Sequence, residues 1–69
     1  MDANYIIYRL KSTLYKYPTV AVLRTRLNNL DEEKREAIFT SLKKQIHKES
    51  NYDIQEPLEE LVYRIPIAS

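Results

Sequence analysis

The 69-residue sequence contains no glycine, no cysteine and no tryptophan, and it has a single histidine. Loops that cradle phosphates or dinucleotides need glycine, because only a residue without a Cβ lets the backbone approach the ligand closely. The absence of glycine therefore excludes a P-loop and a Rossmann fingerprint. The absence of cysteine excludes disulfides, and one histidine alone does not supply a structural zinc site. We expect no metal and no cofactor.

The sequence also has no large excess of positive or negative charge and no long apolar run. Eleven basic and ten acidic residues leave a net charge of +1, which is too close to neutral to predict a nucleic-acid or membrane partner. No apolar run approaches the roughly 20 residues that a membrane span needs. The acidic start, residues 1–4, is not typical of a signal peptide. We expect a cytoplasmic protein with no membrane partner.

The length predicts a single helical domain over residues 1–66, followed by a frayed tail at 67–69. A chain this short buries only about 60% of its unfolded surface, so its core is marginal without further support. Disulfides and a structural metal are not expected here. Self-association, most simply as a homodimer, is the remaining source of stability.

Apolar residues recur at the helical period in four stretches, which predicts an all-α fold, a small bundle of three to four short helices. The expected helices span about 3–16, 18–29, 31–48 and 57–65. Asp2 is placed to cap the first helix and Asp31 the longest one, because a carboxylate can accept hydrogen bonds from unpaired backbone N–H groups. For residues 19–22 a short β-branched strand is the alternative, but no second strand is evident for it to pair with.

The sequence also predicts how these helices are connected. Pro18 and Pro57 are expected at the first positions of the second and last helices, where a missing N–H costs nothing. Residues 50–55 lose the helical period and predict a loop. The short connection at 28–31 predicts that the second and third helices are neighbours in space.

A row of tyrosines runs along the first expected helix. Tyr5, Tyr8, Ser12 and Tyr15 follow one another at steps of three, four and three, opposite an apolar face. The apolar face consists of Ala3, Ile6, Ile7, Leu10 and Leu14, extended by Tyr17. One interpretation is that the tyrosines pack their rings and leave their hydroxyls in water. The other is a contact surface, since tyrosine is enriched at protein interfaces.

We predict that the protein works by binding another protein or a second copy of itself, as a regulator, inhibitor or accessory factor. The predicted protein interface consists of Tyr5, Tyr8, Lys11, Ser12 and Tyr15. Charge is also segregated, with a balance of +4 over residues 1–30 and −3 over residues 51–69. This pattern suits head-to-tail self-pairing, and it equally suits packing of the last helix against the first within one chain.

Nucleic-acid binding is the alternative function. The second and third helices suggest a helix-turn-helix-like pair whose basic residues would meet phosphate or base edges. The candidate contacts are Arg24, Arg26, Lys43, Lys44, His47 and Lys48. The acidic start of the third helix, residues 31–36, opposes this interpretation because phosphate repels it. Lysines at a helix C-terminus also interact favourably with the helix dipole and need no ligand.

An enzyme is the third and weakest class. His47 lies on the polar face of its helix, and no serine or carboxylate of that helix is spaced to orient it as a triad requires. Glu56, Glu59 and Glu60 lie where the last helix is expected to start, and carboxylates stabilise that end of a helix without any catalytic role. We therefore expect no catalytic residues.

The layout resembles that of the Hha-type nucleoid modulators in its length, its Tyr5…Arg9-Leu10 opening, its long third helix and its short last helix at Pro57. The family's Ala-Ala-Asp-His-Arg signature would fall near residues 41–46, where this chain has S-L-K-K-Q-I. The family's cysteine is also absent. No functional position is transferred from this resemblance.

Overall fold

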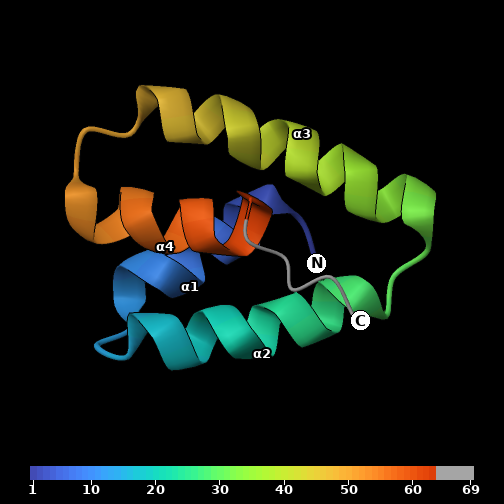
Figure 1. The fold of residues 1–69 in the computed structure, drawn as a ribbon, viewed down its shortest axis with the longest axis horizontal. Coiled ribbons are helices and arrows are strands. Elements are labelled where there is room, and N and C mark those ends of the chain that lie inside the picture. The colour runs from blue at the N-terminus through green and yellow to red at the C-terminus, as the bar shows by residue number, and fades with distance from the viewer. Residues whose placement is uncertain (64–69) are drawn as a thin grey trace.

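The computed structural model describes residues 1–63, which form four α-helices (Figure 1). They are α1 (Ala3–Ser12), α2 (Lys16–Asn28), α3 (Glu32–Lys48) and α4 (Tyr52–Tyr63). The predicted all-α class and small bundle are confirmed, and residues 19–22 are helical. None of the helices in this range combines the length and apolarity needed to cross a bilayer.

Helices α1 and α4 pack on each other and occupy the middle of the molecule, with α2 and α3 on opposite sides of them (Figure 1). The prediction that the second and third helices are neighbours in space therefore holds only at the ends that residues 28–31 connect, and not along the rest of the two helices. A short connection brings only the facing ends of two helices together, and here α2 and α3 diverge from it while α4 fills the space between them.

All four helices contribute to one apolar core. Its side chains repeat at helical spacing on each helix, as the sequence pattern predicts. The core consists of Ile6, Leu10, Val20, Leu23, Leu27, Ile38, Phe39, Leu42, Ile46, Ile54, Leu58, Leu61 and Val62.

The first helix ends earlier than predicted, at Ser12 rather than at residue 16. Thr13 is extended, with φ −93° and ψ 146°. Lys16 then begins α2 and donates from Nζ to the carbonyl oxygens of Leu10 and Thr13, at 2.9 and 2.7 Å. The cation thereby satisfies carbonyls that the end of α1 leaves without helical partners. Pro18 is the third residue of α2, where an N–H would have no helical acceptor either.

The last helix begins five residues before the predicted start at Pro57, so the predicted loop at 50–55 is largely helical. Asn51 explains the difference, since its Oδ1 accepts a hydrogen bond from the backbone N–H of Asp53 at 2.9 Å and caps the helix. Ile54 also continues the buried stripe one turn upstream of Leu58. Pro57 lies inside the helix, where it removes only the backbone bond to the carbonyl of Asp53.

The predicted caps of the other helices are present. Asp2 Oδ1 accepts from the backbone N–H of Tyr5 at 2.8 Å, and Asp31 Oδ1 accepts from that of Lys34 at 3.0 Å. The predicted end of the last helix at residue 65, the C-terminal bound of the predicted domain at residue 66 and the predicted tail at 67–69 lie outside the described residues.

Candidate protein-binding surface

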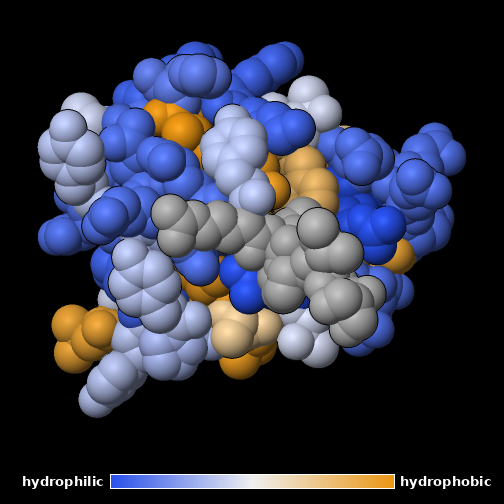
Figure 2. Space-filling view, in the orientation of Figure 1, coloured by the Kyte–Doolittle hydropathy of each residue, from blue (hydrophilic) through white to orange (hydrophobic). Residues whose placement is uncertain are grey.

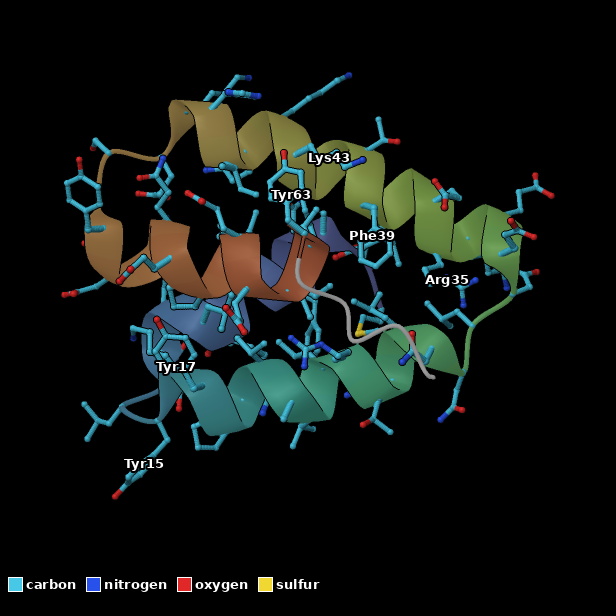
Figure 3. All side chains as sticks on the ribbon, viewed as in Figure 1. Tyr15, Tyr17, Arg35, Phe39, Lys43 and Tyr63 are labelled. Carbon is cyan, nitrogen blue, oxygen red and sulfur yellow. The ribbon has the colours of Figure 1, made fainter. Side chains whose placement is uncertain are left out.

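Exposed apolar side chains gather at the α1–α2 connection and along the outer side of α2. Leu14 is 92% exposed and Tyr15 is 71% exposed, while Tyr17 and Val22 are about half exposed. We define the outer α2 surface by six exposed residues: Leu14, Tyr15, Tyr17, Pro18, Ala21 and Val22. In Figure 2, orange and pale side chains lie over this part of the molecule, and Figure 3 shows Tyr15 pointing away from the protein.

Every exposed residue from Leu14 to Thr25 is uncharged, although charged residues make up 30% of the chain. The stretch contains two cations, Lys16 and Arg24, and both are only partly exposed. Lys16 donates to carbonyls of the α1–α2 connection, and Arg24 Nη2 donates to the carbonyl of Glu60 on α4 at 3.0 Å. Internal hydrogen bonds thus turn both charges away from the outer α2 surface.

The opposite side of α2 is also apolar. Thr19, Val20, Leu23 and Leu27 are buried against the other helices. The part of α2 from Pro18 to Leu23 thus carries apolar residues on two sides, which is typical of a helix segment that is covered on more than one side. Within residues 1–63 only the inner side of α2 is covered by other helices, and the apolar residues of its outer side are exposed.

The connection between α1 and α2 holds Leu14 and Tyr15 outward. The backbone N–H of Tyr15 donates to Thr13 Oγ1 at 3.0 Å, and Thr19 Oγ1 lies 3.3 Å from the same oxygen. Together with the Lys16 hydrogen bonds, these contacts fix the turn on both sides. The expectation that Leu14 extends the apolar face of the first helix is wrong, because α1 ends before it.

Tyr5, a predicted interface residue, instead connects α1 to α2. Its hydroxyl oxygen accepts hydrogen bonds from Arg9 Nη1 at 2.8 Å and from Arg26 Nη1 at 3.3 Å. Both guanidinium groups also lie against its ring, 5.8 and 5.6 Å from the centroid. The hydrogen bond from Arg9, followed by that from Arg26, lowers the pKa of the Tyr5 phenol below its usual value of 10.0.

The remaining predicted interface residues do not lie with Tyr15 on one helix face. Tyr8, Lys11 and Ser12 are exposed on α1, and the Ser12 hydroxyl donates to the carbonyl of Tyr8. Lys11 forms an ion pair with Glu49 at 3.8 Å. Because α1 ends at Ser12, Tyr15 belongs to the outer α2 surface rather than to the predicted tyrosine row.

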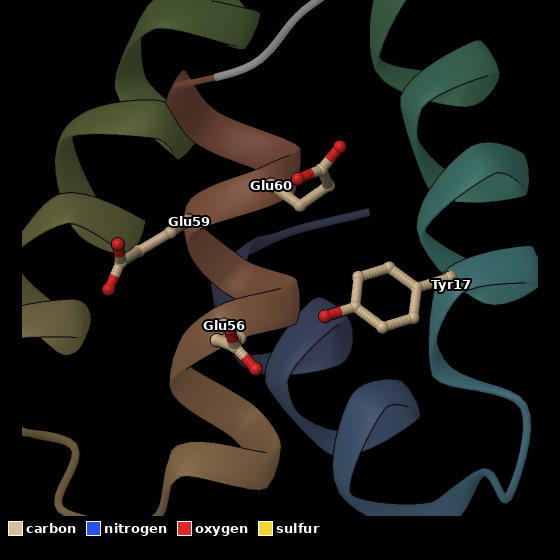
Figure 4. A pocket seen from close by; sticks show the side chains of 4 residues that line it. All are labelled: Tyr17, Glu56, Glu59 and Glu60. Atoms are coloured by element: carbon tan, nitrogen blue, oxygen red, sulfur yellow. The ribbon is translucent and has the colours of Figure 1, made fainter.

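A small acidic cavity borders the outer α2 surface. It is lined by Tyr17 from α2 and by Glu56, Glu59 and Glu60 from α4. Figure 4 shows the Tyr17 ring directed toward α4, with Glu56 and Glu60 on its side of that helix. The cavity therefore places negative charge at one edge of an otherwise uncharged surface.

The basic residues proposed for nucleic-acid contact divide between two sides of the molecule. Lys43, Lys44, His47 and Lys48 are exposed on α3. Lys43 Nζ lies 5.9 Å from the centre of the Tyr63 ring, a contact visible in Figure 3. Arg24 and Arg26 lie on α2, where the first is bonded to α4 and the second to Tyr5. The two sets do not form one continuous basic surface.

Residues 1–63 contain no group of three or more histidine, cysteine, aspartate or glutamate side chains arranged to hold a metal ion.

The outer α2 surface contains three residues that sequence reasoning placed elsewhere. Leu14 and Tyr17 were assigned to the inner face of the first helix, and Val22 was given no role. The run Val20–Leu23 carried the missed signal, because four consecutive apolar residues spread over more than one side of a helix.

No family model, curated protein or solved structure matches this chain. The function of the chain is therefore inferred from its own residues.

Proposed function

We propose that this chain is a non-enzymatic, cytoplasmic protein-binding module that recognises its partner through the outer α2 surface. It would act as a regulator, an inhibitor or an accessory factor. The observation that carries the proposal is the apolar outer side of α2, where every exposed residue from Leu14 to Thr25 is uncharged.

The composition of the surface supports this role. The centres of protein interfaces are depleted in charge and enriched in aromatic residues, and Tyr15 supplies a ring here, with Tyr17 at the edge next to α4. Fully burying one exposed leucine side chain contributes about 1.5–3 kcal/mol. Leu14, at 92% exposure, has almost all of that free energy still to gain on binding.

A second copy of the chain is the partner we favour. An isologous contact would place the outer α2 surfaces of two copies against each other. The two charged residues between 14 and 25, Lys16 and Arg24, are only partly exposed and are bonded to backbone carbonyls, so like charges would not face each other at its centre. Self-association would also add buried area to a chain whose own core is small.

Light scattering over a range of protein concentrations tests this proposal. Leu14→Glu and Val22→Glu each place a charge in the outer α2 surface, and we expect either to weaken the dimer at least about tenfold, because burying an unpaired carboxylate is costly. Ser41→Glu, on the exposed side of α3, is the matched control and should leave association unchanged.

If the partner is a different protein, we expect a different result from the same variants. The unchanged chain would then remain monomeric at high concentration, while Leu14→Glu would abolish capture of the partner and Ser41→Glu would not. If all three variants retain every interaction of the unchanged protein, the outer α2 surface is not the binding surface.

Nucleic-acid binding remains the rival proposal, supported by the exposed side chains of Lys43, Lys44, His47 and Lys48 on α3. Affinity for duplex DNA should then fall steeply with salt, and Lys44→Gln should reduce the slope of that dependence by about one. DNA binding that does not depend on salt, or a salt dependence whose slope Lys44→Gln leaves unchanged, would exclude nucleic-acid binding through these residues.

A further inference from the structure

Two arginines from different helices converge on one phenol oxygen. Arg9 on α1 and Arg26 on α2 each donate one N–H to Tyr5 Oη, at 2.8 and 3.3 Å. The two guanidinium groups therefore share a single neutral acceptor, and both lie against the same ring. Two cations held this close repel each other unless an anion lies between them.

Within residues 1–63, no protein carboxylate lies between the guanidinium groups of Arg9 and Arg26. The ion pair found in this range joins Lys11 and Glu49, and neither Arg9 nor Arg26 lies within 4.0 Å of an acidic oxygen. Each guanidinium has further N–H donors beyond the one bonded to Tyr5. The Tyr5 oxygen accepts two hydrogen bonds, which leaves its own proton free to be donated.

A surface cavity lies beside Tyr5 and Arg26. It is lined by Met1, Asp2, Tyr5 and Arg26 and has a volume of about 270 Å³. Asp2 brings one carboxylate to the cavity wall, and its Oδ1 accepts a hydrogen bond from the backbone N–H of Tyr5. Of the two arginines only Arg26 lines the cavity, and Arg9 joins it through its hydrogen bond to Tyr5 Oη. Because the Asp2 carboxylate repels anions, a ligand here needs the attraction of both positive charges.

We propose that Tyr5, Arg9 and Arg26 form a binding site for a dianionic phosphate, either the free ion or the end group of a phosphomonoester. A tetrahedral dianion offers oxygens to donors that arrive from two helices and from the phenol, and it balances both positive charges. Charge-assisted bonds of arginine to phosphate are among the strongest hydrogen bonds in proteins. The site does not depend on the outer α2 surface.

The test is an NMR titration of the full chain with inorganic phosphate and, separately, with methyl phosphate, at constant ionic strength maintained with chloride. We expect saturable shifts centred on the amides of Tyr5, Arg9 and Arg26. Arg26→Gln should weaken phosphate binding at least about tenfold, since it removes a charge-assisted contact. Equal binding of both probes would identify a phosphate end group as sufficient, and binding of inorganic phosphate alone would restrict the site to the free ion.

Matched variants and anions make the result specific. Arg35→Gln removes an arginine from α3 and should bind phosphate like the unchanged chain, as should Val22→Glu on the outer α2 surface. Tyr5→Phe, which keeps the ring, should weaken binding, whereas Tyr8→Phe should not. Three results would overturn the proposal: shifts that do not saturate, equal affinity in Arg26→Gln and Arg35→Gln, or acetate that binds as tightly as phosphate.

Discussion

Tyr5 illustrates how neighbours determine what a single side chain does. On sequence alone it is one of several phenols at helical spacing on α1. In the structure, Arg26 reaches it from a position 21 residues away, and its hydroxyl becomes a contact between two helices. Tyr8, one turn further along the same helix, has no such neighbour and stays 66% exposed.

The Tyr5 phenol should ionise below the usual tyrosine pKa of 10.0, because Arg9 and Arg26 favour its phenolate. An absorbance titration should show one early phenolate phase, which Tyr5→Phe removes and Arg26→Gln moves back toward pH 10. Tyr8→Phe is the control and should leave the early phase in place.

The same shift has a consequence for stability. Since the folded pKa is lowered, the ionised form contributes stability that grows as pH rises from the folded pKa toward the unfolded value of 10.0 and is lost as pH falls back. Below the folded pKa the phenol is protonated in both states, so Tyr5 ionisation should not affect unfolding there. Denaturant unfolding of Tyr5→Phe and of the unchanged chain, once at neutral pH and once near pH 10, would measure this difference in stability.

At the scale of the helices, side chains at the ends determine where each element begins and stops. Asp2, Asp31 and Asn51 each accept a hydrogen bond from a backbone N–H in the first turn that follows. Lys16 satisfies carbonyls at the end of α1, and this contact couples the end of one helix to the start of the next.

Asn51→Ala should destabilise the protein by about 1 kcal/mol, because it removes the cap that allows α4 to begin upstream of Pro57. Urea unfolding followed by circular dichroism measures this free energy. Ser50→Ala, at the exposed neighbouring position, should change it by less than about 0.5 kcal/mol. Equal effects of the two substitutions would show that the Asn51 cap does not stabilise α4.

At the scale of the molecule, a single small core supports all four helices. A chain of this length is expected to have an unfolding free energy of about 3–10 kcal/mol. Leu58 is fully buried in the middle of that core, whereas Leu14 is almost fully exposed. A substitution at Leu58 therefore tests folding, whereas a substitution at Leu14 tests binding.

Leu58→Ala should cost about 2–5 kcal/mol through lost burial and a cavity, which is enough to unfold part of the population. Leu14→Ala should change the unfolding free energy of the isolated protomer by less than about 0.5 kcal/mol. Denaturant unfolding at low protein concentration compares them. Similar losses from both substitutions would contradict the assignment of Leu14 to the surface.

Much of the candidate site was beyond prediction from sequence for a specific reason. The tyrosine row was extended to Tyr15, and the apolar face to Leu14, on the assumption that the first helix continues to residue 16. A lysine from the next helix ends α1 early, and Tyr15 then joins Val22 rather than Tyr8 on one side of the protein. Such a contact between two elements leaves no periodic signal in the sequence.

The sequence by itself determined the helical class, the buried stripes and the caps at Asp2 and Asp31, because helical periodicity and capping act over only three or four residues. Only the tertiary structure decided that α4 lies between α2 and α3, that Arg26 reaches Tyr5, and that the outer side of α2 has no cover within residues 1–63. The physical reason is that exposure and long-range hydrogen bonds depend on where other helices lie, and each local pattern is compatible with many such arrangements.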